Sequence, residues 1–270
     1  MNLTANIQFI GQLTEPPKLH GITREKDHCP LIERQLQVSD LRDCASPPTL
    51  DEAGFTLVQG DRLAFGTSLE TVAHKNLEQA TALVTQISGA TQLIHMNSVI
   101  RRSERSPLYM QGGTTLPARF AHSDYGAGER EILRWLNHIM KTDSRSLDPY
   151  QRVAMYNTWR TLTPPPADVP LALCDVRSLG SDDRVAVDFF EQMPEDPDWF
   201  FKMSVYRFNE CQRWGYFSGM QDDEFILFKG FDSDPNRAAL TPHAAFTASN
   251  CPASAEPRAS IESRFLALFY

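Results

Sequence analysis

The sequence predicts a mainly β protein with flanking helices, built around a double-stranded β-helix, the jelly roll of cupin-like proteins. In the second half of the chain, short apolar segments alternate with turns, and no helix of length separates the later segments. The segments are residues 152–159, 171–175, 200–208, 215–217, 224–228, 242–247 and 260–269. Many short strands at roughly even spacing are typical of a sandwich or barrel rather than a parallel α/β sheet.

The first 66 residues carry few helix signals and several prolines. Strand-like runs stand at residues 7–10, 36–38 and 55–58. An arm of this kind usually wraps a core or roofs a pocket, and we expect it to do one of the two here.

Two helices are predicted between the arm and the β-rich half. In the first, Thr67 and Glu70 form a Thr-x-x-Glu capping box, the apolar residues that follow share one face, and Gly89 stands where a C-cap belongs. The second helix is expected over residues 128–141, and a strand over residues 91–96 lies between the two.

A polar stretch at residues 101–116 is predicted to be a mobile loop. Because it directly precedes the first histidine-bearing strand of the core, it could serve as a lid, and a plain surface connection is an equally open interpretation. No linker-like tract divides the 270 residues. We therefore expect a single domain over residues 1–270, with an N-terminal arm, helix and lid loop over 1–116 and a jelly-roll core over 117–270.

Composition and charge narrow the choice of partners. The formal net charge of −8 argues against the basic face that binds nucleic acid or an anionic membrane. The five cysteines are odd in number and show no Cys-x-x-Cys spacing, which favours reduced thiols. No signal peptide or membrane-spanning window is recognised. We expect a cytoplasmic protein that acts on a small molecule, with a homodimer as one option for its assembly.

The tripeptide His122-Ser123-Asp124 is the first candidate metal motif. In a strand, residues i and i+2 project from the same face, so the imidazole of His122 and the carboxylate of Asp124 can hold one ion together. His243 lies far down the chain at the start of an apolar run and could supply the third ligand, although a hydrogen-bonded core histidine is the plainer interpretation. Two histidines and one carboxylate with open positions are the ligands of non-haem Fe(II) oxygenases.

Arg258 and Ser260 enter the last apolar segment and share a face by the period-2 rule. The planar fork of an arginine matches carboxylate geometry, so the two side chains can converge on one carboxylate. Arg264 shares this parity and could either assist Arg258 or form an ion pair with Glu262 that braces the barrel. Asn157 could reach into the barrel toward a co-substrate or make a structural hydrogen bond.

This order of motifs, His-x-Asp, a distal His and an Arg-x-Ser entering the last strand, resembles Fe(II)/2-oxoglutarate-dependent dioxygenases. A narrower resemblance rests on four further stretches. They are Pro170-Leu171-Ala172-Leu173-Cys174-Asp175, Asn157-Thr158-Trp159-Arg160, Leu227-Phe228-Lys229-Gly230-Phe231-Asp232-Ser233 and Arg258-Ala259-Ser260-Ile261-Glu262-Ser263-Arg264. They are similar to the family that includes the 7α-cephem-methoxylase component and gibberellin desaturase-like oxidoreductases of secondary metabolism.

The resemblance implies a chemistry and assigns residues to it. Fe(II) would be held by His122, Asp124 and His243, while 2-oxoglutarate would be bound by Arg258 and Ser260, with Asn157 and Arg264 as further contacts. O2 would be the oxidant, and succinate and CO2 the co-products. The substrate class would be a small natural product or an amino-acid derivative, changed at a C–H bond by hydroxylation, desaturation or ring formation.

Two alternatives remain open from the sequence. One is a jelly-roll metal enzyme that does not use 2-oxoglutarate, and the other is a ligand-binding accessory subunit of a multi-component modification system. Arg258 separates the first alternative from the dioxygenase, because an Arg258→Ala variant should keep its activity only if no 2-oxoglutarate is bound there.

Overall fold

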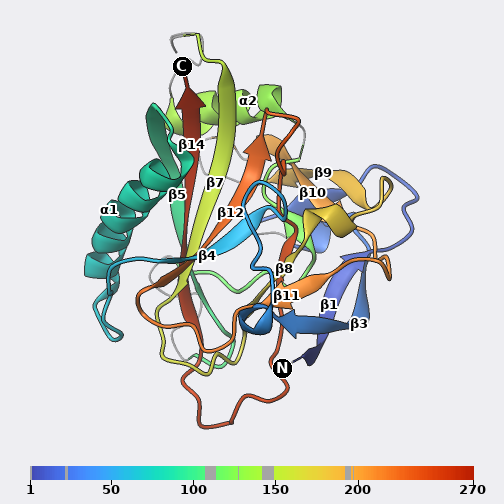
Figure 1. The fold of residues 1–270 in the computed structure, drawn as a ribbon. Coiled ribbons are helices and arrows are strands. Elements are labelled where there is room, and N and C mark those ends of the chain that lie inside the picture. The colour runs from blue at the N-terminus through green and yellow to red at the C-terminus, as the bar shows by residue number, and fades with distance from the viewer. Residues whose placement is uncertain are drawn as a thin grey trace.

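Two facing β-sheets form the body of the protein (Figure 1). The structure is a computed structural model that describes residues 2–21, 24–106, 114–126, 128–141, 149–191, 196 and 198–270. Within these residues one sheet has nine strands and the other has five. The mainly β architecture predicted from the sequence, a jelly roll with flanking helices, is confirmed.

The nine-stranded sheet draws its strands from the whole length of the chain. Its order is β1 (Leu3–Ile10), β3 (Leu31–Asp40), β11 (Trp214–Tyr216), β8 (Leu171–Cys174), β13 (His243–Ala245), β6 (His122–Ser123), β10 (Phe200–Tyr206), β9 (Arg184–Phe190) and β2 (Lys18–His20). The short strands β13 and β6 lie side by side near its middle, so this sheet contributes the histidine-bearing strands.

The five-stranded sheet has the order β4 (Phe55–Gln59), β12 (Glu224–Asp232), β7 (Arg152–Thr161), β14 (Ala259–Phe269) and β5 (Gln92–Arg102). All four pairs in it are antiparallel. Strands β7 and β14 are buried along almost their whole length, because one face meets the other sheet and the opposite face meets a helix.

Apolar residues fill the space between the sheets. Phe55, Ile226 and Phe228 of the five-stranded sheet pack with Leu171 and Leu173 of the nine-stranded sheet. Since side chains alternate along a strand, the polar residues at every second position of β7 and β14 also point into this space. Residues at those positions belong to the candidate site described below.

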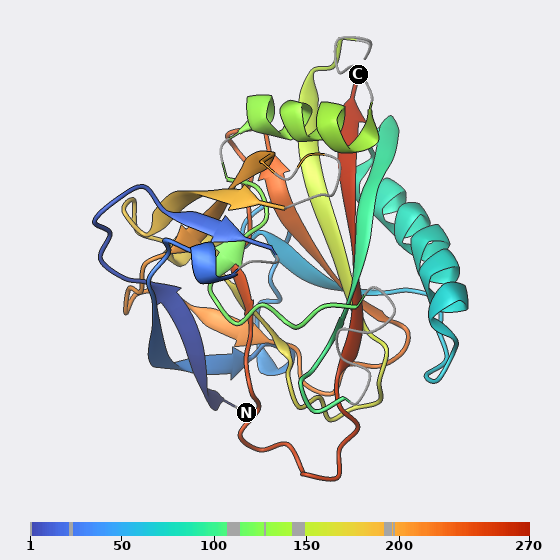
Figure 2. The same ribbon diagram turned by 180° about the vertical axis from the view of Figure 1, so that it is seen from behind.

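The outer face of the five-stranded sheet is covered by α1 (Leu69–Ser88), as Figures 1 and 2 show. Ala80 and Val84 of α1 pack against Tyr156 and Phe265. The second helix, α2 (Glu129–Met140), crosses the end of the molecule that holds the C-terminus (Figure 2). Three short 3-10 helices complete the described elements: Arg24–Lys26, Leu41–Asp43 and Val176–Ser178. Neither described α-helix is long and apolar enough to cross a lipid bilayer.

The predicted cap of the first helix is wrong by one residue. Ser68 is the N-cap, since its side chain accepts a hydrogen bond from the Thr71 backbone N–H at 3.4 Å, whereas the Thr67 hydroxyl donates to the Ala64 carbonyl. The predicted C-cap is confirmed: Gly89 adopts φ 66°, a left-handed conformation that glycine takes without strain.

Two strand predictions also need correction. The segment predicted over residues 91–96 extends to Arg102 as β5, because it pairs with β14 along that length, so residues 101 and 102 belong to a strand and not to a loop. The strand β9 was not predicted at all. Residues 107–113 of the predicted lid lie outside the described residues, and the lid and the division of the domain at residue 116 stay predictions.

Candidate metal centre

Strands from distant parts of the chain bring three candidate ligands together. β6 pairs antiparallel with β13, so that His243 stands opposite His122, and Asp124 follows β6 at once. One ligand atom from each of His122, Asp124 and His243 lies within 4.8 Å of the others. Among the described residues this is the one group of three metal-binding side chains. The predicted ligands therefore converge on one place inside the barrel.

Backbone carbonyls fix the orientation of both imidazoles. Nδ1 of His122 lies 2.8 Å from the Phe120 carbonyl oxygen, and Nδ1 of His243 lies 3.1 Å from the Thr241 carbonyl oxygen. A carbonyl oxygen only accepts hydrogen bonds, so each Nδ1 carries the proton. In a neutral ring with this tautomer, Nε2 carries the lone pair, and this is the form that binds a metal.

The charges at this site also suit a metal ion. Burial, together with the neighbouring His243, lowers the pKa of His122 to about 3, so the imidazole is neutral at physiological pH. Burial alone would raise the pKa of Asp124, but the charge of Arg264 holds it below its usual value. A neutral imidazole and an ionised carboxylate are the protonation states that metal binding requires.

Asp124 is held by side chains of the opposite sheet. Arg264 donates to both carboxylate oxygens, from Nε to Oδ2 and from Nη2 to Oδ1, at 3.1 Å each. Asn157 donates to Oδ2 at 2.5 Å and to Glu262 Oε1 at 3.0 Å. Glu262 in turn lies 2.8 Å from Arg264. Such partners of a ligand orient it and tune its basicity.

Two imidazoles and one buried carboxylate fit a non-haem Fe(II) ion. This set leaves the remaining coordination positions to small molecules, as in the facial triads of oxygenases. Apolar rings flank the ligands: the ring centroids of Phe120 and His122 are 4.7 Å apart, and those of Phe228 and His243 are 4.9 Å apart. The site is therefore screened from bulk water on these sides.

The guanidinium of Arg258 is buried and has no carboxylate partner among the described residues, although the Arg258 backbone N–H donates to Asp168 Oδ1 at 2.8 Å. Its side chain is 1% exposed, and Nε donates to Ser260 Oγ at 3.0 Å while Nη1 donates to the Val169 carbonyl at 2.7 Å. Its guanidinium lies over the ring of Trp159, 5.1 Å from the centroid. Burial and the nearby charge of Arg101 lower the pKa of Arg258. No carboxylate of the described residues forms an ion pair with it, so an anionic ligand there would be favoured.

The four predicted co-substrate residues thus divide into two pairs. Arg258 and Ser260 contact each other on β14 and near its start. Arg264 and Asn157 instead contact Asp124. Arg264 and Asn157 point into the barrel, since both reach Asp124 of the opposite sheet. Ser260 shares the strand face of Arg264, and Arg258 contacts Ser260.

Arg101 lies beside the candidate site, and the sequence did not reveal this position. It pairs with Ser260 across β5 and β14, and its Nη1 donates to the Leu116 carbonyl at 2.8 Å. Its charge lowers the pKa of both His122 and Arg258, so it lies near both. The residue falls in the stretch predicted to be a loop, and only the strand register places it beside Ser260.

Sequence comparisons identify relatives of known class. The chain is 30% identical to the Fe(II)/2-oxoglutarate-dependent dioxygenase nvfI of Aspergillus novofumigatus over 185 residues, which is 68% of this chain and 63% of that protein. It is 28% identical to the hydroxylase/desaturase efuI of Hormonema carpetanum over 246 residues, covering 85% of this chain and 81% of the relative. The resemblance to 2-oxoglutarate-dependent oxygenases drawn from the sequence is confirmed.

The fold has a solved counterpart as well. The structure of the iron and alpha-ketoglutarate-dependent endoperoxidase NvfI matches with a TM-score of 0.80 at 22% identity, over 99% of this chain and 98% of that one. The two chains share their fold over almost their whole lengths. A family model described as an oxidoreductase/YMDC permease-like domain matches residues 11–268. The chain belongs to this oxidoreductase family.

Proposed function

We propose that this chain is a non-haem Fe(II)/2-oxoglutarate-dependent oxygenase that acts on a C–H bond of a small natural-product or amino-acid-derived substrate. The observation that carries the proposal is the convergence of His122, Asp124 and His243 on one place inside the barrel. The same inward lining holds the buried guanidinium of Arg258, which forms no ion pair with a carboxylate of the described residues. The names of the relatives support the same class of reaction.

Each residue has a stated task in this proposal. His122 and His243 offer Nε2 lone pairs, and Asp124 offers an ionised oxygen, so the three hold Fe(II) on one side. A bound Fe(II) supplies the activation of O2 and its coupling to the decarboxylation of 2-oxoglutarate, which yields succinate and CO2. The protein's own contribution is geometry, charge and a water-poor pocket.

Arg258 and Ser260 are proposed to bind the distal carboxylate of 2-oxoglutarate. Nε of Arg258 already donates to Ser260 and Nη1 to the Val169 carbonyl, so the remaining N–H groups of Nη1 and Nη2 are the ones that donate to the carboxylate. The burial of the guanidinium makes each hydrogen bond to an anion stronger than the same bond in water. Arg264 was also a candidate for this task. Because Nε and Nη2 of Arg264 donate to Asp124 and its Nη1 donates to Asn97, we propose that Arg264 and Asn157 orient the metal ligand and that Arg258 is the main anchor.

The choice among hydroxylation, desaturation and ring formation depends on the substrate. A cytoplasmic location and a homodimer also stay predictions. A jelly-roll metal enzyme that does not use 2-oxoglutarate, or an accessory subunit, would share the metal ligands but would not consume 2-oxoglutarate.

Anaerobic titration tests the proposal. Purified protein is titrated with Fe(II) and then with 2-oxoglutarate, and the visible absorption band of the chelate is followed. O2 is then admitted and succinate is quantified. We expect the band in the parent protein, its loss in His122→Ala and His243→Ala, and succinate formation from the parent alone. A parent protein that binds Fe(II) but yields neither band nor succinate would refute the proposal.

A further inference from the structure

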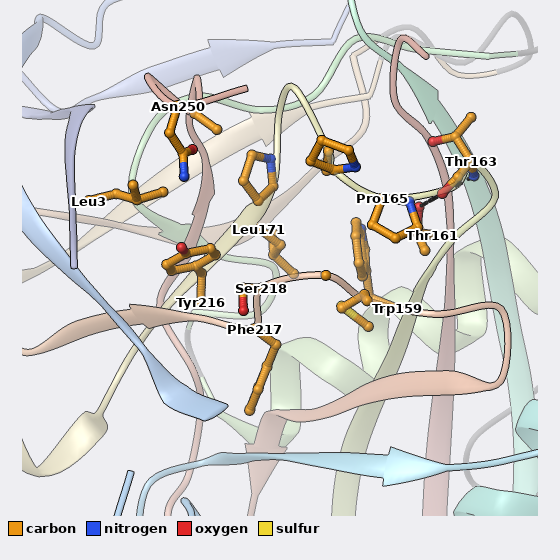
Figure 3. A pocket seen from close by; sticks show the side chains of 16 residues that line it. Leu3, Trp159, Thr161, Thr163, Pro165, Leu171, Tyr216, Phe217, Ser218 and Asn250 are labelled. Atoms are coloured by element: carbon orange, nitrogen blue, oxygen red, sulfur yellow. Dashed lines mark hydrogen bonds between the residues drawn. The ribbon is translucent and has the colours of Figure 1, made fainter. Parts of the chain in front are cut away.

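A cleft opens where β7 ends and β8 begins (Figure 3). It holds about 600 Å³ of empty space, counting its open mouth. Trp159, Leu171, Phe217 and Met220 form its deep wall, because these four side chains also belong to the apolar core between the sheets. None of His122, Asp124 and His243 lines the cleft.

The deep wall of the cleft nevertheless adjoins the metal centre. On β7, Trp159 lies two residues from Asn157, which donates to Asp124. On β8, Leu171 lies two residues from Leu173, which stands opposite His243. Two residues of a strand span about 6.6 Å, and residues two apart face the same way. The cleft and the metal centre therefore occupy consecutive positions of one inward lining.

Trp159 also connects the cleft with the proposed co-substrate anchor. It lines the cleft, and the guanidinium of Arg258 lies over its ring. Its indole N–H is buried and has no hydrogen-bond partner among the described residues. A buried donor without a partner costs free energy, which a ligand that accepts a hydrogen bond would relieve.

The chemistry of the lining selects a class of ligand. None of the 16 lining residues carries a charge. Aromatic rings, prolines and aliphatic side chains make up most of the wall, and hydroxyl or amide groups come from Thr161, Thr163, Tyr216, Ser218 and Asn250. Burying an ionised ligand here would cost its hydration without an opposite charge to offset the loss. Apolar rings with a few hydroxyl or carbonyl groups would be bound well.

We infer that this cleft is the substrate site of the enzyme and that it takes a neutral, largely apolar, ring-bearing molecule with hydroxyl or carbonyl groups. The inference rests on the proposed function. Trp159 is then a positioning residue: one part of its side chain contacts the substrate, while its ring supports Arg258. Substrate and co-substrate binding would both depend on it.

The binding half of the inference is tested with the full chain and a neutral fluorescent probe, N-phenyl-1-naphthylamine, without metal. We expect saturable binding at one site. The two mouth variants, Asn250→Trp and Ser218→Trp, add bulk at two places in the lining and should each weaken binding at least tenfold. The matched control is Ala253→Trp, in the same loop as Asn250 but outside the cleft, which should bind as the parent does. Circular dichroism verifies that each variant is folded.

Charge selection gives a second readout. The anionic probe 8-anilinonaphthalene-1-sulfonate should bind at this site at least tenfold more weakly than the neutral probe. Equal affinity of the two probes would overturn the inference. Parental affinity for the neutral probe in both mouth variants would overturn it as well.

The positioning role of Trp159 needs a readout of its own. Trp159→Ala should lower the affinity for the neutral probe and the affinity for 2-oxoglutarate by tenfold or more. The affinity for 2-oxoglutarate is measured anaerobically with Fe(II). Trp159→Phe keeps a ring under Arg258 and should restore most of the 2-oxoglutarate affinity. Trp135→Phe, a buried tryptophan outside the cleft, is the control and should change neither affinity. A Trp159→Ala variant with parental affinity for 2-oxoglutarate would refute this role.

Failure of this inference is distinguishable from failure of the proposed function. If the parent protein forms succinate and both mouth variants bind the probe with parental affinity, the cleft is not the substrate site. A protein that binds the probe as expected but forms no chelate and no succinate refutes the oxygenase, and with it the substrate role of the cleft.

Discussion

Arg264 donates one hydrogen bond to each carboxylate oxygen of Asp124, both at 3.1 Å, across 140 residues of sequence. The pair is nearly buried, with side chains 11% and 12% exposed. Because one of these oxygens is the proposed metal donor, the pair fixes the direction in which the third ligand points. A buried pair of this kind contributes more to orientation than to stability.

Replacing Arg264 should weaken metal binding. Arg264→Lys keeps the charge but loses the bidentate geometry, and Arg264→Gln loses both. We expect the affinity for Fe(II) to fall about tenfold in the first variant and up to about 100-fold in the second, in line with the loss of other ligand-orienting partners. Anaerobic Fe(II) titration provides the measurement. Arg177→Lys is the matched control, since Arg177 pairs with Asp175 in the same bidentate way but on the surface. Parental iron affinity in Arg264→Gln would contradict the orienting role.

Replacing Arg258 should act on the co-substrate and not on the metal. A charged hydrogen bond contributes about 1.5–3 kcal/mol, so Arg258→Ala should raise the KM for 2-oxoglutarate roughly 10- to 100-fold or more. Ser260→Ala removes the hydroxyl beside the guanidinium and should have a smaller effect. Fe(II) affinity, measured in parallel, should remain that of the parent protein. Unchanged succinate formation by Arg258→Ala at limiting 2-oxoglutarate would favour a metal enzyme that does not use it.

Gly54 supports the segment that carries His243. It adopts φ 94°, and its carbonyl accepts a hydrogen bond from the Thr241 hydroxyl at 2.6 Å. A Cβ at this position would lie 2.6 Å from that hydroxyl and 2.7 Å from the Leu240 carbonyl oxygen. Since the Thr241 backbone carbonyl holds the His243 ring, Gly54→Ala should disturb the metal ligand as well as the fold.

A second glycine separates backbone strain from this clash. Gly89 also has a positive φ, of 66°, but a Cβ there would meet nothing within 4 Å. Gly89→Ala should cost about 1–2 kcal/mol of unfolding free energy, the penalty of the left-handed conformation alone. Gly54→Ala should cost more and should also weaken Fe(II) binding. Equal losses in urea unfolding, with unchanged iron affinity, would show that the contact with Thr241 does not matter.

A buried ion network outside the metal centre makes stability depend on pH. Asp232 pairs with Arg152 and Lys229, and the side chains of Asp232 and Lys229 are fully buried. Burial opposes ionisation, but these two cations hold the pKa of Asp232 below its usual value. Its stabilising contribution is therefore complete above about pH 4 and is lost as pH falls through the lowered pKa of the folded state.

Asp232→Asn should remove this acid-dependent loss. At neutral pH it should also lower the unfolding free energy by roughly 3–5 kcal/mol, because Lys229 is left buried without its closest partner. Urea unfolding between pH 3 and 7 measures both effects. The comparison is Asp188→Asn, which breaks a partly exposed pair with Lys202. It should lower the unfolding free energy by about 1 kcal/mol or less. A similar loss in both variants would contradict the importance of burial.

The sequence predicted the site residues through local rules. The period-2 rule put Arg258, Ser260 and Arg264 on one face, and in the structure all three face inward from β14 or its start. Residue chemistry alone selected two histidines and a carboxylate for a metal and an arginine for a carboxylate. The predicted C-cap at Gly89 was correct, because a left-handed backbone conformation admits few residue types. The predicted N-cap was wrong by one residue, because Thr67 offers the same hydroxyl group as Ser68.

The tertiary structure decided which of these side chains meet. Arg258 and Arg264 are the same residue type on the same strand face, and their partners differ because pairing register brings Arg264 to Asp124 and leaves Arg258 with Ser260 and a backbone carbonyl. Arg101 lies beside Ser260 only because β5 extends along β14. A sequence specifies periodicity and chemistry at short range, whereas register arises from the packing of strands that lie more than 100 residues apart.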